Sequence, residues 1–208
     1  MNRQPFSTNA VYHVYNRGTE KRKIFLDHAD WSRFLSNLQE FNDANPAMHW
    51  KYKESEVQLR TPPLVQILAY CLMPNHYHLM LRQIHENGIP LFMQKLGTGY
   101  TNYFNQKNER SGALFQGRFK SVAVERDEYL GYLPHYIHLN PKEVVGENWR
   151  TYPWSSYLAY IGRPNPALSV DDFEFMLSLY EPTGYQHHLD EWLASKEKQN
   201  DLASVLLD

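Results

Sequence analysis

Cysteine, long apolar runs and net charge are all scarce in this sequence of 208 residues. Its one cysteine, Cys71, excludes a disulfide within the chain and is typical of a small core residue. No run approaches the roughly 18 apolar residues that a membrane-spanning helix needs, and no apolar signal core stands near the first residue. We therefore expect a cytoplasmic protein with no membrane partner.

Net charge at neutral pH is −2, which does not favour binding to nucleic acid, because Lys and Arg must neutralise phosphates to drive such binding. The charge is unevenly distributed, however. Residues 1–166 have a balance of +5, whereas residues 167–208 have a balance of −7. An acidic segment is usually a solvated helix face, but its sign would also allow it to cover a basic surface.

Two histidines one residue apart stand in an apolar strand pattern. Tyr77, Leu79 and Leu81 alternate with His76 and His78, which predicts a β-strand. Side chains at i and i+2 of a strand share one face about 6 to 7 Å apart, so two imidazoles can reach one divalent ion. Because histidines in sheets are also common as ordinary core residues, the metal-site hypothesis needs a third ligand and a reactive group nearby.

A second segment places a tyrosine and an asparagine together. Asp127 can cap a helix, helical apolar spacing follows, and Asn140 precedes a proline, so we expect a helix over residues 127–140. Tyr136 and Asn140 are four residues apart and share one face. On composition alone, Tyr136 could be an amphipathic core-edge residue and Asn140 an ordinary helix end. Pro134 predicts either a bend or a later helix start.

The other periodicities predict an α+β fold. The expected elements are strands at 10–17, 65–73, 76–83 and 119–125, and helices at 28–43 and 88–108. Their order is βαββαβ, the ferredoxin-like arrangement with an antiparallel sheet, and the helix over 127–140 is an addition to it.

Two further features of the chain set its expected divisions. A long loop is expected over 46–64, with paired prolines near its end. Pro164 and Pro166 mark a boundary, beyond which helical spacing resumes. We therefore predict a domain over 1–165 and an acidic, helical C-terminal extension over 166–208.

Four ordered blocks of the sequence resemble a known family. The run His76-Tyr77-His78 matches the His-hydrophobic-His signature of the HUH single-tyrosine transposases. The other three blocks resemble the REP-associated tyrosine transposase branch of that family: Tyr12-His13-Val14-Tyr15-Asn16-Arg17-Gly18, Gln116-Gly117-Arg118-Phe119-Lys120-Ser121 and Tyr136-Ile137-His138-Leu139-Asn140-Pro141. The resemblance covers about residues 10–160.

This resemblance implies a metal-dependent endonuclease or transposase that acts on single-stranded DNA. In such enzymes two histidines and a polar side chain one turn after the tyrosine hold Mg²⁺ or Mn²⁺, and the matching residues are His76, His78 and Asn140. The matching nucleophile is Tyr136, which would form a 5′-phosphotyrosyl bond and free a 3′-hydroxyl. The sequence does not identify a general base.

The resemblance also implies partners and a location. Members of the branch act at repetitive extragenic palindromes, so we expect single-stranded hairpin DNA as the partner and association with the nucleoid in the cytoplasm. Related transposases work as dimers, whereas the REP-associated branch is more often monomeric. A monomer is therefore favoured over a dimer here.

Basic residues cluster in two of the matching blocks or just after them. Arg17, Lys21 and Arg22 follow the first strand, and Arg118 and Lys120 flank an aromatic residue before the last. Basic side chains interleaved with aromatic ones suit the binding of a single strand, because the basic groups contact phosphates and the aromatic rings stack on nucleobases. Each cluster alone would be an ordinary solvated surface, but beside a nuclease centre the five residues are predicted to bind DNA.

Two other functions fit the same residues. One is a DNA-binding protein of this fold whose chemistry has lapsed. The other is a small hydrolase in which the histidine pair binds zinc and a water molecule attacks the substrate. Zinc hydrolases usually need a third histidine or a carboxylate, and His13 or His135 would have to supply it.

Overall fold

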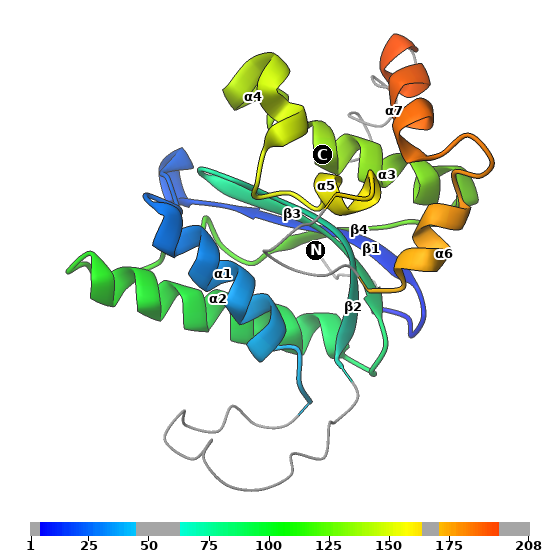
Figure 1. Ribbon diagram of the computed structural model, residues 1–208. Coiled ribbons are helices and arrows are strands. Elements are labelled where there is room, and N and C mark those ends of the chain that lie inside the picture. The colour runs from blue at the N-terminus through cyan, green and yellow to red at the C-terminus, as the bar shows by residue number, and fades with distance from the viewer. Residues whose placement is uncertain (1–4, 45–62, 164–170, 196–208) are drawn as a thin grey trace, which may run out of the picture.

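The strands predicted from the sequence form one sheet. A computed structural model describes residues 5–44, 63–163 and 171–195 of the chain (Figure 1). The four strands are antiparallel and lie in the order β2-β3-β1-β4. Their bounds are β1 (Val11–Arg17), β2 (Val65–Met73), β3 (His76–Gln83) and β4 (Lys120–Ala123). The expected ferredoxin-like arrangement is confirmed.

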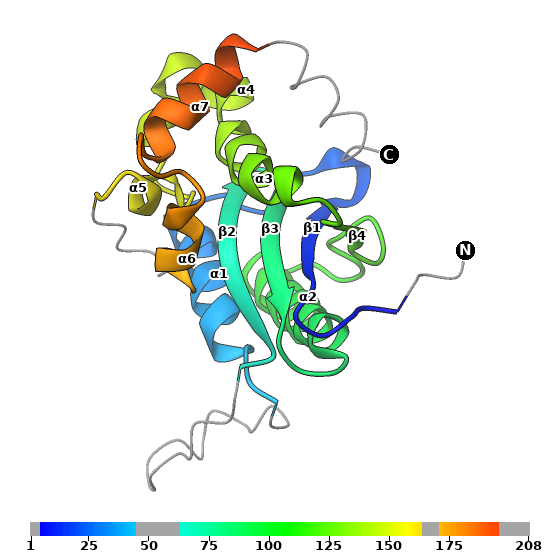
Figure 2. The same cartoon turned by 90° about the vertical axis from the view of Figure 1, so that its right-hand side faces the viewer.

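Helices cover both faces of the sheet. α1 (His28–Glu40) and α2 (Gly88–Lys107) lie on one face, and α3 (Asp127–Leu139) crosses the other (Figures 1 and 2). The shorter helices are η1 (Thr19–Lys21), α4 (Lys142–Val145), η3 (Gly146–Thr151), α5 (Tyr157–Tyr160), α6 (Phe173–Ser178) and α7 (Tyr185–Ala194). Each helix predicted before residue 140 is present, with bounds within three residues of the expected ones.

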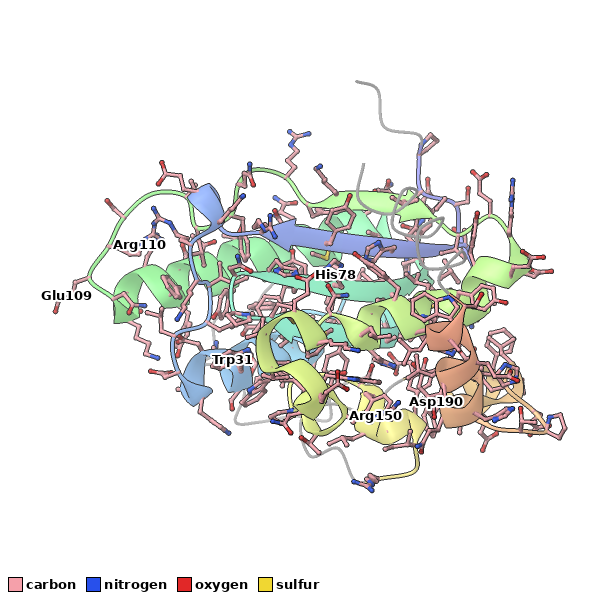
Figure 3. All side chains as sticks on the ribbon, turned by 90° about the horizontal axis from the view of Figure 1, so that it is seen from above. Trp31, His78, Glu109, Arg110, Arg150 and Asp190 are labelled. Atoms are coloured by element: carbon pink, nitrogen blue, oxygen red, sulfur yellow. The ribbon has the colours of Figure 1, made fainter. Side chains whose placement is uncertain are left out.

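Acidic residues of the C-terminal extension pair with the body of the protein. Asp172 forms an ion pair with Arg82, and the Asp190 carboxylate lies 2.5 Å from the Arg150 guanidinium (Figure 3). α6 and α7 also pack their apolar residues beside α3. Within residues 171–195, these two carboxylates therefore face arginines outside the predicted DNA-binding set. The expected division at residue 165 stays a prediction.

The outer edge of β2 is hydrogen-bonded by segments that are not strands. The backbone of β2 exchanges hydrogen bonds of 2.8 to 3.3 Å with loop residues and with the start of the extension. Ile67 exchanges bonds with Asp171 and Tyr70 exchanges bonds with Ser156, whereas the Leu72 N–H donates to the Trp154 carbonyl. The hydroxyls of Tyr152 and Tyr160 add bonds to β2 carbonyls.

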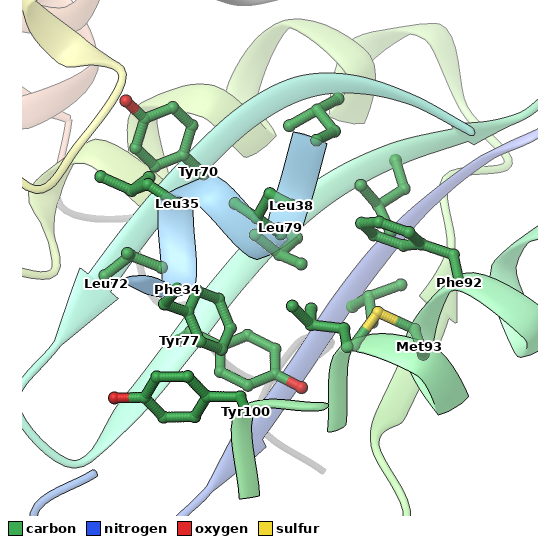
Figure 4. Close-up of a cluster of buried hydrophobic side chains, with 14 of the residues drawn as sticks. Phe34, Leu35, Leu38, Tyr70, Leu72, Tyr77, Leu79, Phe92, Met93 and Tyr100 are labelled. Carbon is green, nitrogen blue, oxygen red and sulfur yellow. The ribbon is translucent and has the colours of Figure 1, made fainter. Parts of the chain in front are cut away.

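The alternation in β3 sorts its side chains into two cores. Tyr77, Leu79 and Leu81 point towards α1 and α2, where Phe34 and Tyr100 lie against one another with ring centroids 4.9 Å apart (Figure 4). His76, His78 and Met80 occupy the opposite face, as the period of two requires. The first core consists of hydrophobic residues. The face beneath α3 has a second apolar cluster and also carries the polar groups of His76 and His78.

α3 begins where the sequence predicted but not in the predicted manner. Arg126 is the N-cap residue, without a side-chain hydrogen bond, and Asp127 is the first helical residue. The expected capping role of Asp127 is therefore wrong, and its carboxylate instead lies in the first turn, where the helix dipole favours negative charge. The helix continues across the buried Pro134, so a later start is excluded.

Some predicted features fall outside the described residues. These are residues 46–62 of the long loop and the boundary at Pro164 and Pro166. Among the helices that the structure describes, none is long and apolar enough to cross a membrane.

His135 gives the fold a measurable sensitivity to acid. The ring is 1% exposed, and among the described residues neither ring nitrogen has a hydrogen-bond partner. Burial, together with the nearby His188, lowers its pKa to about 3. The unfolded chain takes up a proton below about pH 6.5, whereas the folded protein does not until about pH 3. The free energy of unfolding is therefore unaffected by this group above about pH 6.5 and decreases as the pH falls from there towards 3.

We expect His135→Phe to reduce this acid sensitivity, because phenylalanine fills a similar volume and cannot be protonated. The free energy of unfolding, measured by urea denaturation, should fall less between pH 7 and pH 5 than in the wild type, by about 2 kcal/mol. His85→Phe, at an exposed position, is the control for the exchange of an imidazole for a phenyl ring. An equal pH dependence in wild type and His135→Phe would show that His135 is not a source of the acid sensitivity.

Candidate active site

The pairing of β1 with β3 assembles one polar face. In the antiparallel register Tyr15 lies opposite His78, and Arg17 lies opposite His76. Because side chains alternate along a strand, His13 joins these four on the face that α3 covers. The sequence predicted the strands, and the register brings their side chains together.

His76 is held by its neighbour in the tight turn. Its Nδ1 lies 2.6 Å from Oδ1 of Asn75, whose Nδ2 donates to the Lys21 carbonyl at 3.2 Å. These bonds fix the Asn75 amide as the acceptor, so His76 carries its proton on Nδ1 and keeps a lone pair on Nε2. Burial and then the charge of Arg17 lower the pKa of His76 to about 4, although a hydrogen bond to Asn140 opposes the shift.

His78 is held by a second histidine. Its Nδ1 lies 2.8 Å from Nε2 of His13, and both rings are buried. Burial lowers the pKa of His13 to about 3, and burial with the neighbouring histidines and Arg17 lowers the pKa of His78 well below its usual value. Both imidazoles are therefore neutral at physiological pH, the form that binds a metal ion.

α3 brings the tyrosine and the asparagine over these histidines. The Tyr136 ring stands nearly perpendicular to the His78 ring, with centroids 5.7 Å apart. Asn140 donates from Nδ2 to the Tyr136 carbonyl at 2.9 Å, and its side chain lies close enough to His76 to raise the pKa of that ring. Because Nδ2 bonds to the helix backbone, the Asn140 carbonyl oxygen is the atom left to face the histidine pair. The structure brings together the four residues predicted to form the metal site and the nucleophile.

The surroundings of Tyr136 oppose ionisation of its phenol. Burial is the main cause, followed by the charge of Glu143 and by Tyr15, and together they raise the pKa to about 12. At neutral pH the phenol is protonated. A positive charge or a proton acceptor is needed before the oxygen becomes a good nucleophile.

A cleft of about 760 Å³ opens above this group. Of the five predicted DNA-binding residues, Arg17, Arg118 and Lys120 line it. Lys21 and Arg22 are exposed on and beside η1, and they are not among the residues of the cleft wall. Nearness in sequence to Arg17 suggested them, but the chain turns away at η1.

Sequence reasoning did not assign a role to several residues of the cleft. They are Tyr15, Asn16, Gln116, Leu139, Lys142, Glu143 and Trp192. Four of them, Tyr15, Asn16, Gln116 and Leu139, stand in the matching blocks, and their place there could have indicated a role in the site. Trp192 comes from α7 in the extension, and no pattern in the sequence indicates that this helix reaches the cleft.

The donor set fits a divalent ion that accepts both nitrogen and oxygen. His76 and His78 have neutral rings with centroids 5.0 Å apart, and Asn140 offers a carbonyl oxygen. No group of three His, Cys, Asp or Glu side chains suited to an ion occurs within the described residues. His13 bonds to His78, and His135 packs against aromatic rings of the extension. Neither supplies the third zinc ligand that a hydrolase would need.

A family model described as "Transposase IS200 like" matches residues 7–140. The chain belongs to the IS200-like transposase family. No curated protein matches the sequence. Among solved structures, the chain is similar to one titled "Structure of the REP associates tyrosine transposase bound to a REP hairpin", with a TM-score of 0.53 and 14% identity. The match covers 83% of this chain and 94% of that one, and it shows a shared fold.

Family membership confirms the resemblance read from the four blocks. It places this IS200-like transposase among proteins of DNA transposition. The match ends at Asn140, the last of the four gathered residues. The helices that follow, including the one that carries Trp192, lie beyond the residues that the family model matches.

Proposed function

We propose that this protein is a metal-dependent endonuclease of single-stranded hairpin DNA that forms a 5′-phosphotyrosyl intermediate. The observation that carries the proposal is the convergence of Tyr136, His76, His78 and Asn140 in one cleft. Ordinary packing of core histidines would not require two ring nitrogens, an amide oxygen and a phenol to converge on one cleft.

The proposed ion site consists of Nε2 of His76, Nε2 of His78 and Oδ1 of Asn140. A bound Mg²⁺ or Mn²⁺ would polarise the scissile phosphate, offset the charge that develops on it and orient the 3′-oxygen. The raised pKa of Tyr136 supports the need for such a charge, because burial, Glu143 and Tyr15 all disfavour the phenolate.

The nucleophilic step belongs to Tyr136. Its phenol gives up a proton as its oxygen attacks the phosphorus, the bond from phosphorus to the 3′-oxygen breaks, and the 3′-oxygen takes up a proton and leaves as a hydroxyl. The 5′ side of the DNA remains on the tyrosine as a phosphodiester. That bond stores the energy needed to rejoin the strand to another 3′-hydroxyl.

Basic side chains at the cleft rim supply the proposed DNA contacts. Arg17, Arg118, Lys120 and Lys142 line the cleft, and the first three come from the predicted set. The Lys120 ammonium also stands 6.0 Å from the centre of the Tyr15 ring. Aromatic and cationic groups side by side suit a single strand, whose bases stack while its phosphates are neutralised.

Tyr136→Phe should abolish the covalent complex, because it removes the attacking oxygen and little else. The assay is a denaturing gel after incubation with hairpin DNA and Mn²⁺. Hairpin binding and the melting temperature should stay near the wild-type values. Tyr132→Phe and Tyr129→Phe, in the same helix, are the matched controls and should retain the complex. A complex that persists in Tyr136→Phe would move the nucleophile to one of those two residues.

The ligand proposal predicts a graded series. His76→Ala and His78→Ala should lose Mn²⁺ binding and cleavage, whereas Asn140→Ala should weaken both, because a neutral carbonyl contributes less than an imidazole. Binding is measured by isothermal titration and cleavage by the gel assay. Activity with Zn²⁺ alone would favour the hydrolase, and hairpin binding without any cleavage by the wild type would favour the lapsed DNA-binding protein.

The cleft proposal predicts a change in salt dependence. Affinity for single-stranded hairpins should fall steeply with salt, and Arg118→Ala should reduce the log–log slope by about 0.7, the value of one phosphate contact. Fluorescence anisotropy over a salt series measures this. Arg163→Ala, at an exposed arginine three residues after α5, is the control that should leave the slope unchanged. Lys21→Ala in the same assay decides whether the DNA path extends over η1.

A further inference from the structure

The two histidines of the proposed ion site are supported in parallel ways. Each has its Nδ1 in a short hydrogen bond, His76 with Oδ1 of Asn75 at 2.6 Å and His78 with Nε2 of His13 at 2.8 Å. In both cases Nε2 is the ring nitrogen that remains for the ion. The first partner is an amide oxygen that can only accept, whereas the second is an imidazole nitrogen that can accept or donate.

The geometry of the His13–His78 pair is that of an aligned hydrogen bond. The ring planes differ by 9°, and the centroids are 5.0 Å apart. This separation is close to the sum of the 2.8 Å bond and the radii of two five-membered rings, so the rings meet edge to edge in nearly one plane. A lone pair of imidazole lies in the ring plane, and the bond is directed along it.

We infer that His13 is a positioning residue that accepts the Nδ1 proton of His78 and so directs the Nε2 lone pair of His78 into the cleft. This inference rests on the proposed function, because it concerns the ion which that function requires. One proton lies between the two rings. If it belonged to His13, the proton of neutral His78 would sit on Nε2, and that nitrogen could not bind an ion.

The surroundings of His13 restrict it to this role. The side chain is fully buried, and its Nδ1 has no hydrogen-bond partner among the described residues. The ring is packed between Tyr15, with centroids 4.8 Å apart, and Tyr136, at 5.9 Å. It reaches the cleft through its bond to His78. An unpaired polar nitrogen in the interior costs free energy, which is explained if the other nitrogen of the ring orients a ligand.

Hydrogen bonds to the ring nitrogen that does not hold the metal fix the tautomer and the orientation of metal-binding histidines, and their loss typically weakens binding about 10- to 100-fold. Two substitutions separate this role from simple packing. His13→Gln places an amide oxygen near the position of Nε2 and keeps an acceptor. His13→Phe keeps a ring of similar volume and removes the acceptor.

The first measurement is the tautomer of His78 in the metal-free protein, from ¹⁵N shifts and two-bond ¹⁵N–¹H correlations of the histidine rings. Wild type and His13→Gln should carry the proton on Nδ1 of His78, which is the less populated tautomer of free neutral histidine. His13→Phe should move it to Nε2. A proton on Nε2 of His78 in the wild type, or the same tautomer in all three proteins, would overturn the inference.

The second measurement is Mn²⁺ affinity by isothermal titration, with the melting temperature as a check of folding. His13→Gln should bind within a few-fold of wild type, whereas His13→Phe should bind about 10- to 100-fold more weakly. Equal affinity in His13→Phe and wild type would show that His13 only fills space. If the wild type bound no Mn²⁺, the proposed metal dependence would fail, while the tautomer measurement would still decide whether His13 positions His78.

Discussion

The register between β1 and β3 is the constraint on which the site depends. It sets Tyr15 against His78 and Arg17 against His76, and it places His13 within 2.8 Å of His78. Because side chains alternate along a strand, a slip of one residue would turn the histidines into the apolar core beneath α1 and α2. The aromatic and aliphatic residues of β3 prevent that slip, since they would then lie beneath the polar cleft. The hydrophobic core thus determines where the polar groups stand.

Burial has opposite consequences for the two kinds of group in the site built on this register. Burial keeps the histidines neutral and available to an ion, but it also keeps the phenol of Tyr136 protonated. In the proposed function, a divalent ion held by the histidines would favour the phenolate, in a cleft that already has cationic side chains at its rim, among them Arg17 and Lys120. Binding of the ion would thus activate the nucleophile.

The sequence predicted local features well and distant ones poorly. Period-two and helical spacing depend on neighbouring residues, so β3, α1 and α3 were predicted within three residues, and the i, i+4 spacing correctly placed Tyr136 beside Asn140. The bond between His13 and His78 spans 65 residues and depends on register, which periodicity does not encode. Trp192 reaches the cleft because α7 docks beside α3, and Lys21 leaves it because the chain turns at η1. Both outcomes follow from packing between segments far apart in the sequence.

The hydrogen-bonded outer edge of β2 has a consequence for how the protein meets other chains. An exposed edge strand is a template on which another molecule can add a strand, and this is a common route to aggregation. Here the loop at 154–156 and the start of the extension occupy the donors and acceptors of β2 without forming a strand themselves. At the opposite edge, β4 is four residues long, too short to guide much pairing. Both edges of the sheet therefore offer little backbone on which another chain could add a strand.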